Sequence, residues 1–368
     1  MGKRHPARMK NPYYNPHKKH HRPNGFQNNY QSFRGKPWRE ILSWRWQAWR
    51  AGHPKPMSEA IPVVAPDLAF IHANAVAGLA MQPAATWIGH ITVLLQIGGL
   101  NILTDPVFSE RCFPVQWAGP KRHTPPGLSL GQLPHIDVVL LSHNHYDHMD
   151  EASLVHLGRQ TGGVPLFITP LGHKHWFAKR GIHRVVELDW WDTHVLEATD
   201  RSLRIPVALT PTQHWSARTT TDALRSLWGS FVVRSPDCHV FFSGDTAYSK
   251  DFVDIQRHFA RDHTPEQGGG FDLAMLPIGA YEPRWFMKDQ HCNPDEAVQI
   301  FQDLGCKQAL AVHWGTFQLT DEALDEPPRA LQTALRAHGV TPERFQVVAV
   351  GATMKVRPRW VPVDQNAP

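Results

Sequence analysis

The sequence predicts an α/β fold in which stacked β-sheets are covered by helices. Short apolar runs rich in β-branched residues recur along the chain, which is typical of buried strands. Segments with a helical pattern are few and well separated, and no repeat of fixed period is visible. The chain has 368 residues, of which 42% are hydrophobic, so it can bury a sizeable core.

Composition divides the chain into four regions. They are a basic, disordered arm at 1–36, a Trp/Arg-rich segment and linker at 37–67, a main domain at 68–360 and a tail at 361–368. The arm is poor in aliphatic residues and therefore lacks the apolar surface to fold alone. Residues 1–56 carry 13 Lys and Arg against one acid, whereas the remainder has 25 basic and 32 acidic residues. Such an arm could touch phosphate or anionic lipid.

Residues 37–50 are predicted to form a helix that begins near Pro37. Five apolar side chains share one face at helical spacing: Trp38, Ile41, Leu42, Trp46 and Trp49. Packing of this face on the main domain is the favoured interpretation. The alternative is contact with a membrane interface, because Trp and Arg occur together on a short helix.

The main domain is predicted to alternate short strands with loops. Strand-like runs lie at 86–90, 92–97, 101–104, 136–141, 166–169, 185–188, 203–210, 239–243 and 308–312. Gly98-Gly99 signals a turn between two of these runs. Residues 150–160 are expected to form a helix with Asp150 as its cap.

The strand at 136–141 leads directly into Ser142-His143-Asn144-His145-Tyr146-Asp147-His148. Side chains two residues apart on an extended backbone point the same way, so His143 and His145 can close on one cation. Asp147 and His148 come after the chain has turned and point elsewhere. Because imidazole nitrogens and carboxylate oxygens are ordinary zinc ligands, one loop could seed two metal sites.

Three further candidate ligands follow other strand-like runs, and a sheet holds such strand-end positions firmly. They are His214, Asp245 and His313. The predicted ligands of one metal are then His143, His145 and His214, and those of the second are Asp147, His148 and His313. The two carboxylate oxygens of Asp245 can touch both metals. Three protein ligands with an open position are the pattern of a catalytic site.

Taken with Gly244-Asp245-Thr246 and His313-Trp314-Gly315, the metal motif resembles the metallo-β-lactamase superfamily. The similarity is closer to the family of N-acylphosphatidylethanolamine-hydrolysing phospholipase D enzymes, for which Pro277–Lys288 is the most specific matching run. One departure follows Gln213-His214-Trp215, where the family commonly has Cys-Lys-Arg and this chain has Ser216-Ala217-Arg218. A lysine role at that place is therefore absent.

The resemblance implies an αββα sandwich, with two packed mixed sheets flanked by helices over residues 68–360. It implies a site for two Zn²⁺ ions, with Fe or Mn as alternatives. It also implies hydrolysis of a phospholipid, N-acylphosphatidylethanolamine, to N-acylethanolamine and phosphatidic acid. A covalent route has no support, because the His-x-Lys-x-x-x-x-Asp motif of other phospholipase D enzymes is absent.

The family also implies roles for residues around the metals. Asp105 is expected to orient a ligand histidine and to serve catalysis. Asp147 and Asp245 are expected to serve catalysis as well as metal binding, and His291 to serve catalysis as well as substrate binding. Tyr146 and His291 match positions that contact the phospholipid head. Their alternatives are that Tyr146 fills space beside the metals and that His291 caps a following helix. Seven aromatic side chains could line an apolar groove or equally pack in the core: Trp176, Phe177, Trp190, Trp191, Tyr281, Trp285 and Phe286.

Two other classes of function stay open. The first is another hydrolase on the same fold: a nuclease, a cyclic-nucleotide phosphodiesterase or a sugar-phosphate lactonase. The acidic main domain argues against nucleic acid as a partner. The second is a metal-stabilised scaffold, which the open ligand set argues against. Without a signal peptide or paired cysteines, we expect a cytoplasmic protein with peripheral membrane contact through residues 1–50; the oligomeric state stays open.

Overall fold

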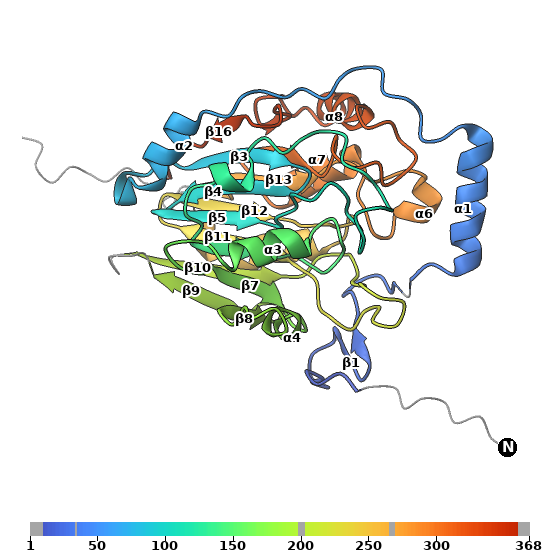
Figure 1. Cartoon of the computed structure of the whole chain (residues 1–368), viewed down its shortest axis with the longest axis horizontal. Coiled ribbons are helices and arrows are strands. Elements are labelled where there is room, and N and C mark those ends of the chain that lie inside the picture. The colour runs from blue at the N-terminus through green and yellow to red at the C-terminus, as the bar shows by residue number, and fades with distance from the viewer. Residues whose placement is uncertain (1–9, 34, 198–202, 265–268, 360–368) are drawn as a thin grey trace, which may run out of the picture.

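The computed structural model describes residues 10–33, 35–197, 203–264 and 269–359. Two seven-stranded mixed sheets pack face to face, and helices lie against the outer face of each (Figure 1). This arrangement confirms the predicted αββα sandwich.

The first sheet has the strand order β16-β3-β4-β5-β6-β7-β8. Its strands are β3 (Ala84–Gly89), β4 (Thr92–Ile97), β5 (Leu100–Thr104), β6 (Val138–Leu140), β7 (Leu166–Pro170), β8 (Val185–Leu188) and β16 (Thr353–Lys355). Gly98 and Gly99 join β4 to β5 with φ of 56° and 76°, the positive values that a tight hairpin turn requires. From β5 to β8 the strands run parallel, so their carboxyl ends meet at one edge.

The second sheet has the order β15-β14-β13-β12-β11-β10-β9. Its strands are β9 (Thr193–Glu197), β10 (Arg204–Thr210), β11 (Ser230–Ser235), β12 (Cys238–Phe242), β13 (Leu273–Pro277), β14 (Gln308–Val312) and β15 (Phe345–Gln346). The strands from β12 to β15 are parallel, and those from β9 to β12 are antiparallel.

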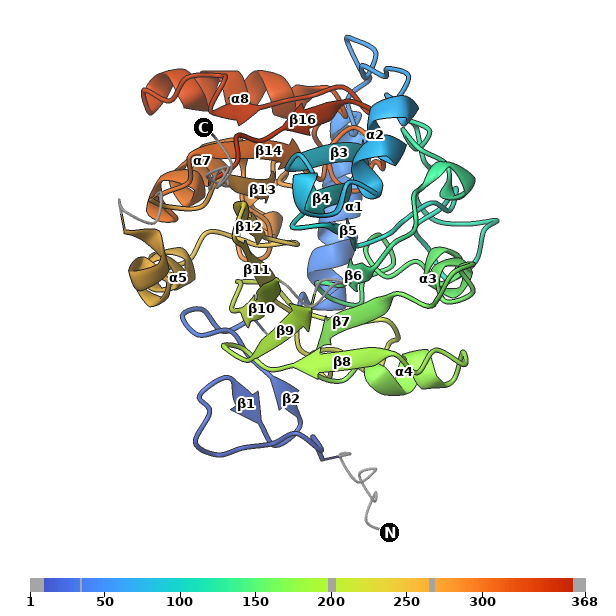
Figure 2. The ribbon, with the colours of Figure 1, turned by 90° about the vertical axis from the view of Figure 1, so that its left-hand side faces the viewer.

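Alternating side chains divide the apolar core into layers. Val93 and Leu95 of β4 belong to the large core that includes the second sheet, whereas Leu94 belongs to the core on the outer face. That outer face is covered by α2 (Leu68–Ala75), α3 (Glu151–Leu157) and α4 (Lys174–Ala178). Helices α5 (Asp251–His258), α7 (Pro294–Asp303) and α8 (Glu326–Ala337) cover the opposite side of the molecule (Figure 2). The shorter turns are α6 (Arg284–Met287), η1 (Gly78–Ala80), η2 (Leu130–Gln132) and η3 (Ala260–His263).

The predicted helix at 150–160 is α3, and Asp150 occupies its N-cap position without a capping hydrogen bond. Its carboxylate accepts instead from the Ser109 hydroxyl, at 2.8 Å, and from the Ser153 hydroxyl. Asp150 therefore stands at the predicted cap position, but its side chain ties the loop after β5 to α3 and does not cap the helix.

Residues 10–33 are folded, so the expectation of a disordered arm at 1–36 is wrong for this part of the chain. Strands β1 (His21–Arg22) and β2 (Gly25–Phe26) form a small hairpin, and the Phe26 side chain is only 1% exposed. The segment packs on the main domain: Phe26 enters the large core, and polar side chains form hydrogen bonds across the boundary. Positions 1–9, 34 and 361–368 lie outside the described residues.

The predicted helix at 37–50 is α1 (Trp38–Ala51), and the favoured interpretation of its tryptophan face is wrong. Trp38, Trp46 and Trp49 are 66%, 55% and 77% exposed. The helix is attached by Trp44, which stacks on Phe286 with ring centroids 4.8 Å apart and donates a hydrogen bond to Asp321. Figure 1 shows α1 at the margin of the sandwich. None of the described helices combines the length and apolar character needed to span a bilayer.

Candidate metal centre

The structure brings the seven predicted ligands together at the carboxyl ends of four strands. His143, His145, Asp147 and His148 follow β6, His214 follows β10, Asp245 follows β12 and His313 follows β14. Most of these side chains are buried, whereas His145 and Asp147 keep partial access to solvent. Residues up to 170 positions apart in the chain therefore meet in one polar cluster at the edge of the sandwich.

The first predicted ligand group is compact. The Nδ1 atom of His145 lies 2.9 Å from His143 Nε2 and 3.3 Å from His214 Nε2. The Oδ2 atom of Asp245 is 3.9 Å from His143 Nε2 and 3.7 Å from His214 Nε2. Three nitrogens and one carboxylate oxygen thus face a common point.

The second group meets the first through Asp245. The Oδ2 atom of Asp147 lies 3.5 Å from His148 Nε2 and 3.3 Å from His313 Nε2. The Oδ2 atom of Asp245 is 3.1 Å from His148 Nε2, and its Oδ1 atom is 3.1 Å from His313 Nε2. Asp245 therefore contacts both groups, as a carboxylate shared by two cations would.

The chemistry of this cluster fits divalent cations. Burial lowers the pKa of His145 to about 3 and that of His214 to about 4, so both imidazoles are neutral and carry a free lone pair at neutral pH. Burial alone would raise the pKa of the Asp245 carboxyl, but His148 and His313 hold it well below its usual value. The buried His148 Nε2 and Asp245 Oδ1 atoms have no hydrogen-bond partner among the described residues. A cation would satisfy both atoms, and the ligand assignment stays a prediction.

Comparison with known proteins identifies the family to which the chain belongs. Residues 100–314 match the Beta-lactamase superfamily domain. The chain belongs to the beta-lactamase superfamily. This membership confirms the predicted family and the prediction of a metal-dependent hydrolase.

Two relatives are similar over most of the main domain. The chain is 37% identical over 259 residues to N-acyl-phosphatidylethanolamine-hydrolyzing phospholipase D 1 of Caenorhabditis elegans, covering 69% of this chain and 70% of that protein. It is 39% identical over 249 residues to the mitochondrial N-acyl-phosphatidylethanolamine-hydrolyzing phospholipase D of Saccharomyces cerevisiae, covering 67% of this chain and 50% of that protein. The isothiocyanate hydrolase from Delia radicum gut bacteria shares the fold, with a TM-score of 0.58 and 19% identity over 75% of this chain and all of that one.

Within this superfamily fold, Asp105 lies behind His148 and fixes its orientation. Its side chain is fully buried, and its Oδ2 atom lies 2.6 Å from His148 Nδ1. The Ser142 N–H donates to the other oxygen at 2.7 Å. A proton held on Nδ1 leaves the Nε2 lone pair facing the cluster. The backbone of Asp105 has φ of 28°, a strained value for a residue with a side chain, which the surrounding hydrogen bonds must maintain.

Sequence reasoning missed His90, which lies directly after β3. Its Nε2 atom is 3.1 Å from Asp147 Oδ2, and its ring centroid is 4.1 Å from that of His313. The side chain is 1% exposed, and burial lowers its pKa to about 3. His90, Asp147, His148 and His313 all offer a ligand atom within 4.8 Å of one another. The available signal was its place at the end of a predicted strand, the rule that had found the other ligands.

His291 and Tyr146 lie at the border of the cluster. The His291 Nε2 atom is 3.8 Å from Asp245 Oδ2, whereas Asn293 caps α7, so the capping alternative for His291 is wrong. Tyr146 donates its hydroxyl to the Arg218 carbonyl oxygen at 2.9 Å, and the Arg218 guanidinium lies 4.1 Å from its ring centroid. Their contacts with a phospholipid head stay predictions.

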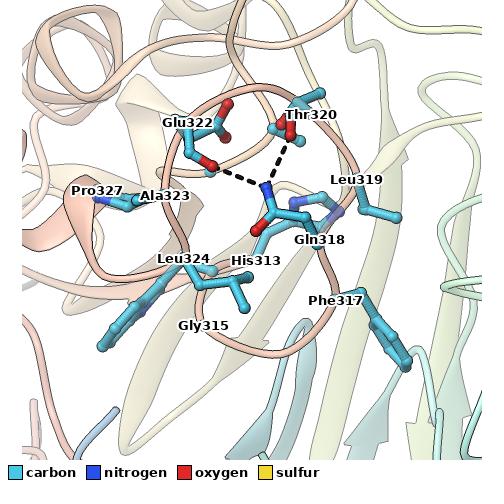
Figure 3. A pocket seen from close by; sticks show the side chains of 13 residues that line it. His313, Gly315, Phe317, Gln318, Leu319, Thr320, Glu322, Ala323, Leu324 and Pro327 are labelled. Atoms are coloured by element: carbon cyan, nitrogen blue, oxygen red, sulfur yellow. Dashed lines mark hydrogen bonds between the residues drawn. The ribbon is translucent and has the colours of Figure 1, made fainter. Parts of the chain in front are cut away.

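The chain after His313 forms a loop that lines a small pocket together with His313 (Figure 3). Gln318 Nε2 donates to the carbonyl oxygens of Thr320 and Glu322, both at 2.7 Å. The buried Glu322 carboxylate accepts the backbone N–H groups of Tyr281 and Glu282, which ties the family-specific run at 277–288 to this loop. The pocket lined by this loop has a volume of about 20 Å³, with room for about one water molecule, so it cannot hold a substrate.

Proposed function

We propose that this chain hydrolyses the phosphodiester of N-acylphosphatidylethanolamine to N-acylethanolamine and phosphatidic acid, using two Zn²⁺ ions. The observation that carries the proposal is the convergence of seven nitrogen and oxygen ligands beside an apolar pocket. The two relatives named for this activity support the choice of substrate. The mixed histidine and carboxylate set suits zinc, with iron and manganese as alternatives.

Residues of the chain would bind the cations, orient a ligand and contact the phosphate group. Bound divalent cations would supply a water molecule of lowered pKa and neutralise the charge that grows on the phosphate oxygens. Water supplies the attacking oxygen, the bond from phosphorus to the ethanolamine oxygen breaks, and the water proton ends on that leaving oxygen. Asp105 keeps the Nε2 atom of His148 directed at the cluster. His291, with Nε2 3.8 Å from Asp245, is placed to donate a hydrogen bond to a phosphate oxygen.

An apolar pocket of about 490 Å³ lies between the start of α1 and the main domain. It is lined by Gly35, Lys36, Pro37, Ile41, Trp215, Ala223, Phe286 and Gln290. The pocket adjoins the metal cluster, because Trp215 follows His214 and its ring lies 4.6 Å from that of His145. Apolar walls suit acyl chains, and the Lys36 ammonium suits a phosphate group. Of the seven aromatic residues considered as groove candidates, Phe286 lines this pocket, whereas Phe177 and Trp190 are buried in the core.

The exposed face of α1 would bring this pocket to a lipid surface. Trp46 and Trp49 are the kind of side chain that enters the headgroup region, and Arg39 and Arg50 flank the face. Ile41 belongs both to α1 and to the pocket lining, so a membrane-bound α1 would place the pocket entrance next to lipid. We therefore propose peripheral membrane contact through residues within 1–50 of a cytoplasmic protein.

Turnover on three substrates tests the function. The full-length protein, loaded with Zn²⁺, is given N-acylphosphatidylethanolamine, phosphatidylcholine and a cyclic nucleotide in parallel. We expect release of N-acylethanolamine from the first lipid, with at least tenfold less activity on the other two substrates. A His143→Ala variant should lose this activity, and equal or greater turnover of the cyclic nucleotide would overturn the proposed substrate.

A further inference from the structure

Asn28 binds both peptide groups of the predicted metal ligand His214. Its Nδ2 atom donates to the His214 carbonyl oxygen at 2.9 Å, and its Oδ1 atom accepts from the His214 N–H at 3.2 Å. The same oxygen accepts from the Trp228 indole N–H at 2.9 Å. Reversing the amide would set its NH₂ group against two N–H donors, so the neighbours define its orientation. The side chain is 4% exposed, so water does not compete for these bonds.

The residues on either side of His214 contact the same N-terminal segment. Gln213 Nε2 donates to the Gln31 carbonyl oxygen at 3.4 Å. The Phe33 ring centroid lies 5.4 Å from that of Trp215. Three consecutive residues of the ligand loop are thus covered by residues 28–33, which lie outside the matched superfamily domain.

Asp189, in the turn after β8, fastens the segment to the main domain. Its carboxylate lies 2.6 Å from Lys18 Nζ, 2.7 Å from His20 Nε2 and 2.8 Å from His21 Nε2. Two histidines and one carboxylate are also a metal-ligand combination. Here, however, the Lys18 ammonium already neutralises the carboxylate at hydrogen-bond distance, so the group is an ion-pair cluster.

We propose that residues 10–33 are a positioning element of the metal centre, in which Asn28 holds His214 in place for its metal. This inference rests on the proposed role of His214 as a ligand. The hydrogen bond from His214 Nδ1 to the Gln290 carbonyl oxygen fixes the ring at its far end, and Asn28 fixes the backbone from which the ring extends. Partners that orient a metal ligand change metal affinity by roughly 10–100-fold. We expect an effect of this size on one of the two ions.

Zinc titration of the metal-free, full-length protein tests the inference. The wild type should bind two Zn²⁺ ions, measured by competition with a chromophoric chelator. Asn28→Ala should bind one ion as tightly as the wild type and the other roughly 10–100-fold more weakly. Asn29→Ala is the matched control, because the neighbouring Asn29 donates to Asp251 at 2.8 Å and does not bind His214. Its Zn²⁺ affinities should equal those of the wild type.

The outcomes separate this inference from the proposed function. A wild type that takes up no Zn²⁺ would remove the proposed metal site and the inference together. Two ions bound by Asn28→Ala with wild-type affinities would overturn the inference alone, as would an equal loss in Asn29→Ala. Should Asn28→Ala be unfolded by circular dichroism, Asn28→Asp replaces it. This variant keeps the acceptor for His214 N–H but sets an oxygen against the His214 carbonyl, so unchanged affinities would again overturn the inference.

Discussion

Replacing Asp105 by Asn should weaken metal binding at the His148 site with almost no change in side-chain shape. The carboxylate accepts three hydrogen bonds, from His148 Nδ1 at 2.6 Å, the Ser142 hydroxyl at 2.5 Å and the Ser142 N–H at 2.7 Å. An amide has one oxygen, so its NH₂ group must face either His148 or the Ser142 N–H. Facing His148, it moves the imidazole proton to Nε2, the atom that points at the cluster.

The size of this effect follows from the bond that is lost. A buried hydrogen bond with a charged partner contributes roughly 1.5–3 kcal/mol. A loss of about 2 kcal/mol is roughly a 30-fold decrease in the affinity for one Zn²⁺, since 1.36 kcal/mol is tenfold. The affinity for the other proposed ion, whose predicted ligands are His143, His145 and His214, should not change.

Zinc competition combined with turnover measures this effect. Asp105→Asn should be inactive at limiting Zn²⁺ and should recover most activity when Zn²⁺ is raised about 100-fold. The control is Asp137→Asn, because the Asp137 carboxylate accepts the Asn101 N–H at 2.8 Å in the sheet, away from the cluster. Wild-type affinity for both ions in Asp105→Asn would refute the positioning role. Low turnover with both ions bound would show instead that Asp105 acts in the chemical step.

Three further outcomes are expected. Removal of metal by EDTA should lower the melting temperature by on the order of 10 °C, because a ligand at 1,000 times its Kd stabilises the folded protein by about 4 kcal/mol. Re-addition of Zn²⁺ should restore the melting temperature. Trp46→Ser combined with Trp49→Ser should weaken binding to anionic phospholipid vesicles at least about tenfold, whereas Trp117→Ser, which replaces another exposed tryptophan, should not. In metal-free protein, His263→Phe should stabilise more at pH 5 than at pH 7.5. Burial lowers the pKa of His263 to about 4, below its value of roughly 6.5 in the unfolded chain. The stability that the neutral, buried His263 contributes to the fold is therefore present above about pH 6.5 and is lost as pH falls toward 4. Neither ring nitrogen of His263 has a hydrogen-bond partner in the described chain, so the substitution by Phe removes no hydrogen bond. The free energy of unfolding is measured in urea, and an equal effect of the substitution at both pH values would contradict the prediction.

The sandwich and the positions of the candidate ligands could be predicted because both depend on local patterns. A strand buried on both faces is a continuous apolar run, such as Val138–Leu140, and its end is visible where polar residues begin. Ligands at such ends therefore share a recognisable position. His90 obeys the same geometry, but it stands alone after its strand, without a second histidine or acid nearby in sequence to attract notice.

The N-terminal segment could not be predicted, because its partners are remote in sequence. His20 and Asp189 are separated by 169 positions, and Asn28 and His214 by 186. Composition indicates whether a segment can bury its own apolar surface, and residues 10–33 cannot do so alone. It does not indicate whether a buried carboxylate elsewhere will accept a lysine and two histidines from that segment. A basic, aliphatic-poor arm is therefore compatible with disorder and with polar docking alike, and the docking partner decides between them.

The tryptophan face of α1 could be predicted from helical periodicity, but what covers this face could not. A stripe of apolar residues at helical spacing indicates that a face will be covered, but the pattern is the same whether the cover is protein or lipid. In this structure Trp44 makes the stacking contact and hydrogen bond that attach the helix, which leaves the stripe of Trp38, Trp46 and Trp49 open. The three tryptophans are exposed, so α1 could bring them to a lipid surface while Trp44 keeps its contacts with Phe286 and Asp321. That asymmetry is the physical reason to test vesicle binding with variants of the stripe while Trp44 is left intact.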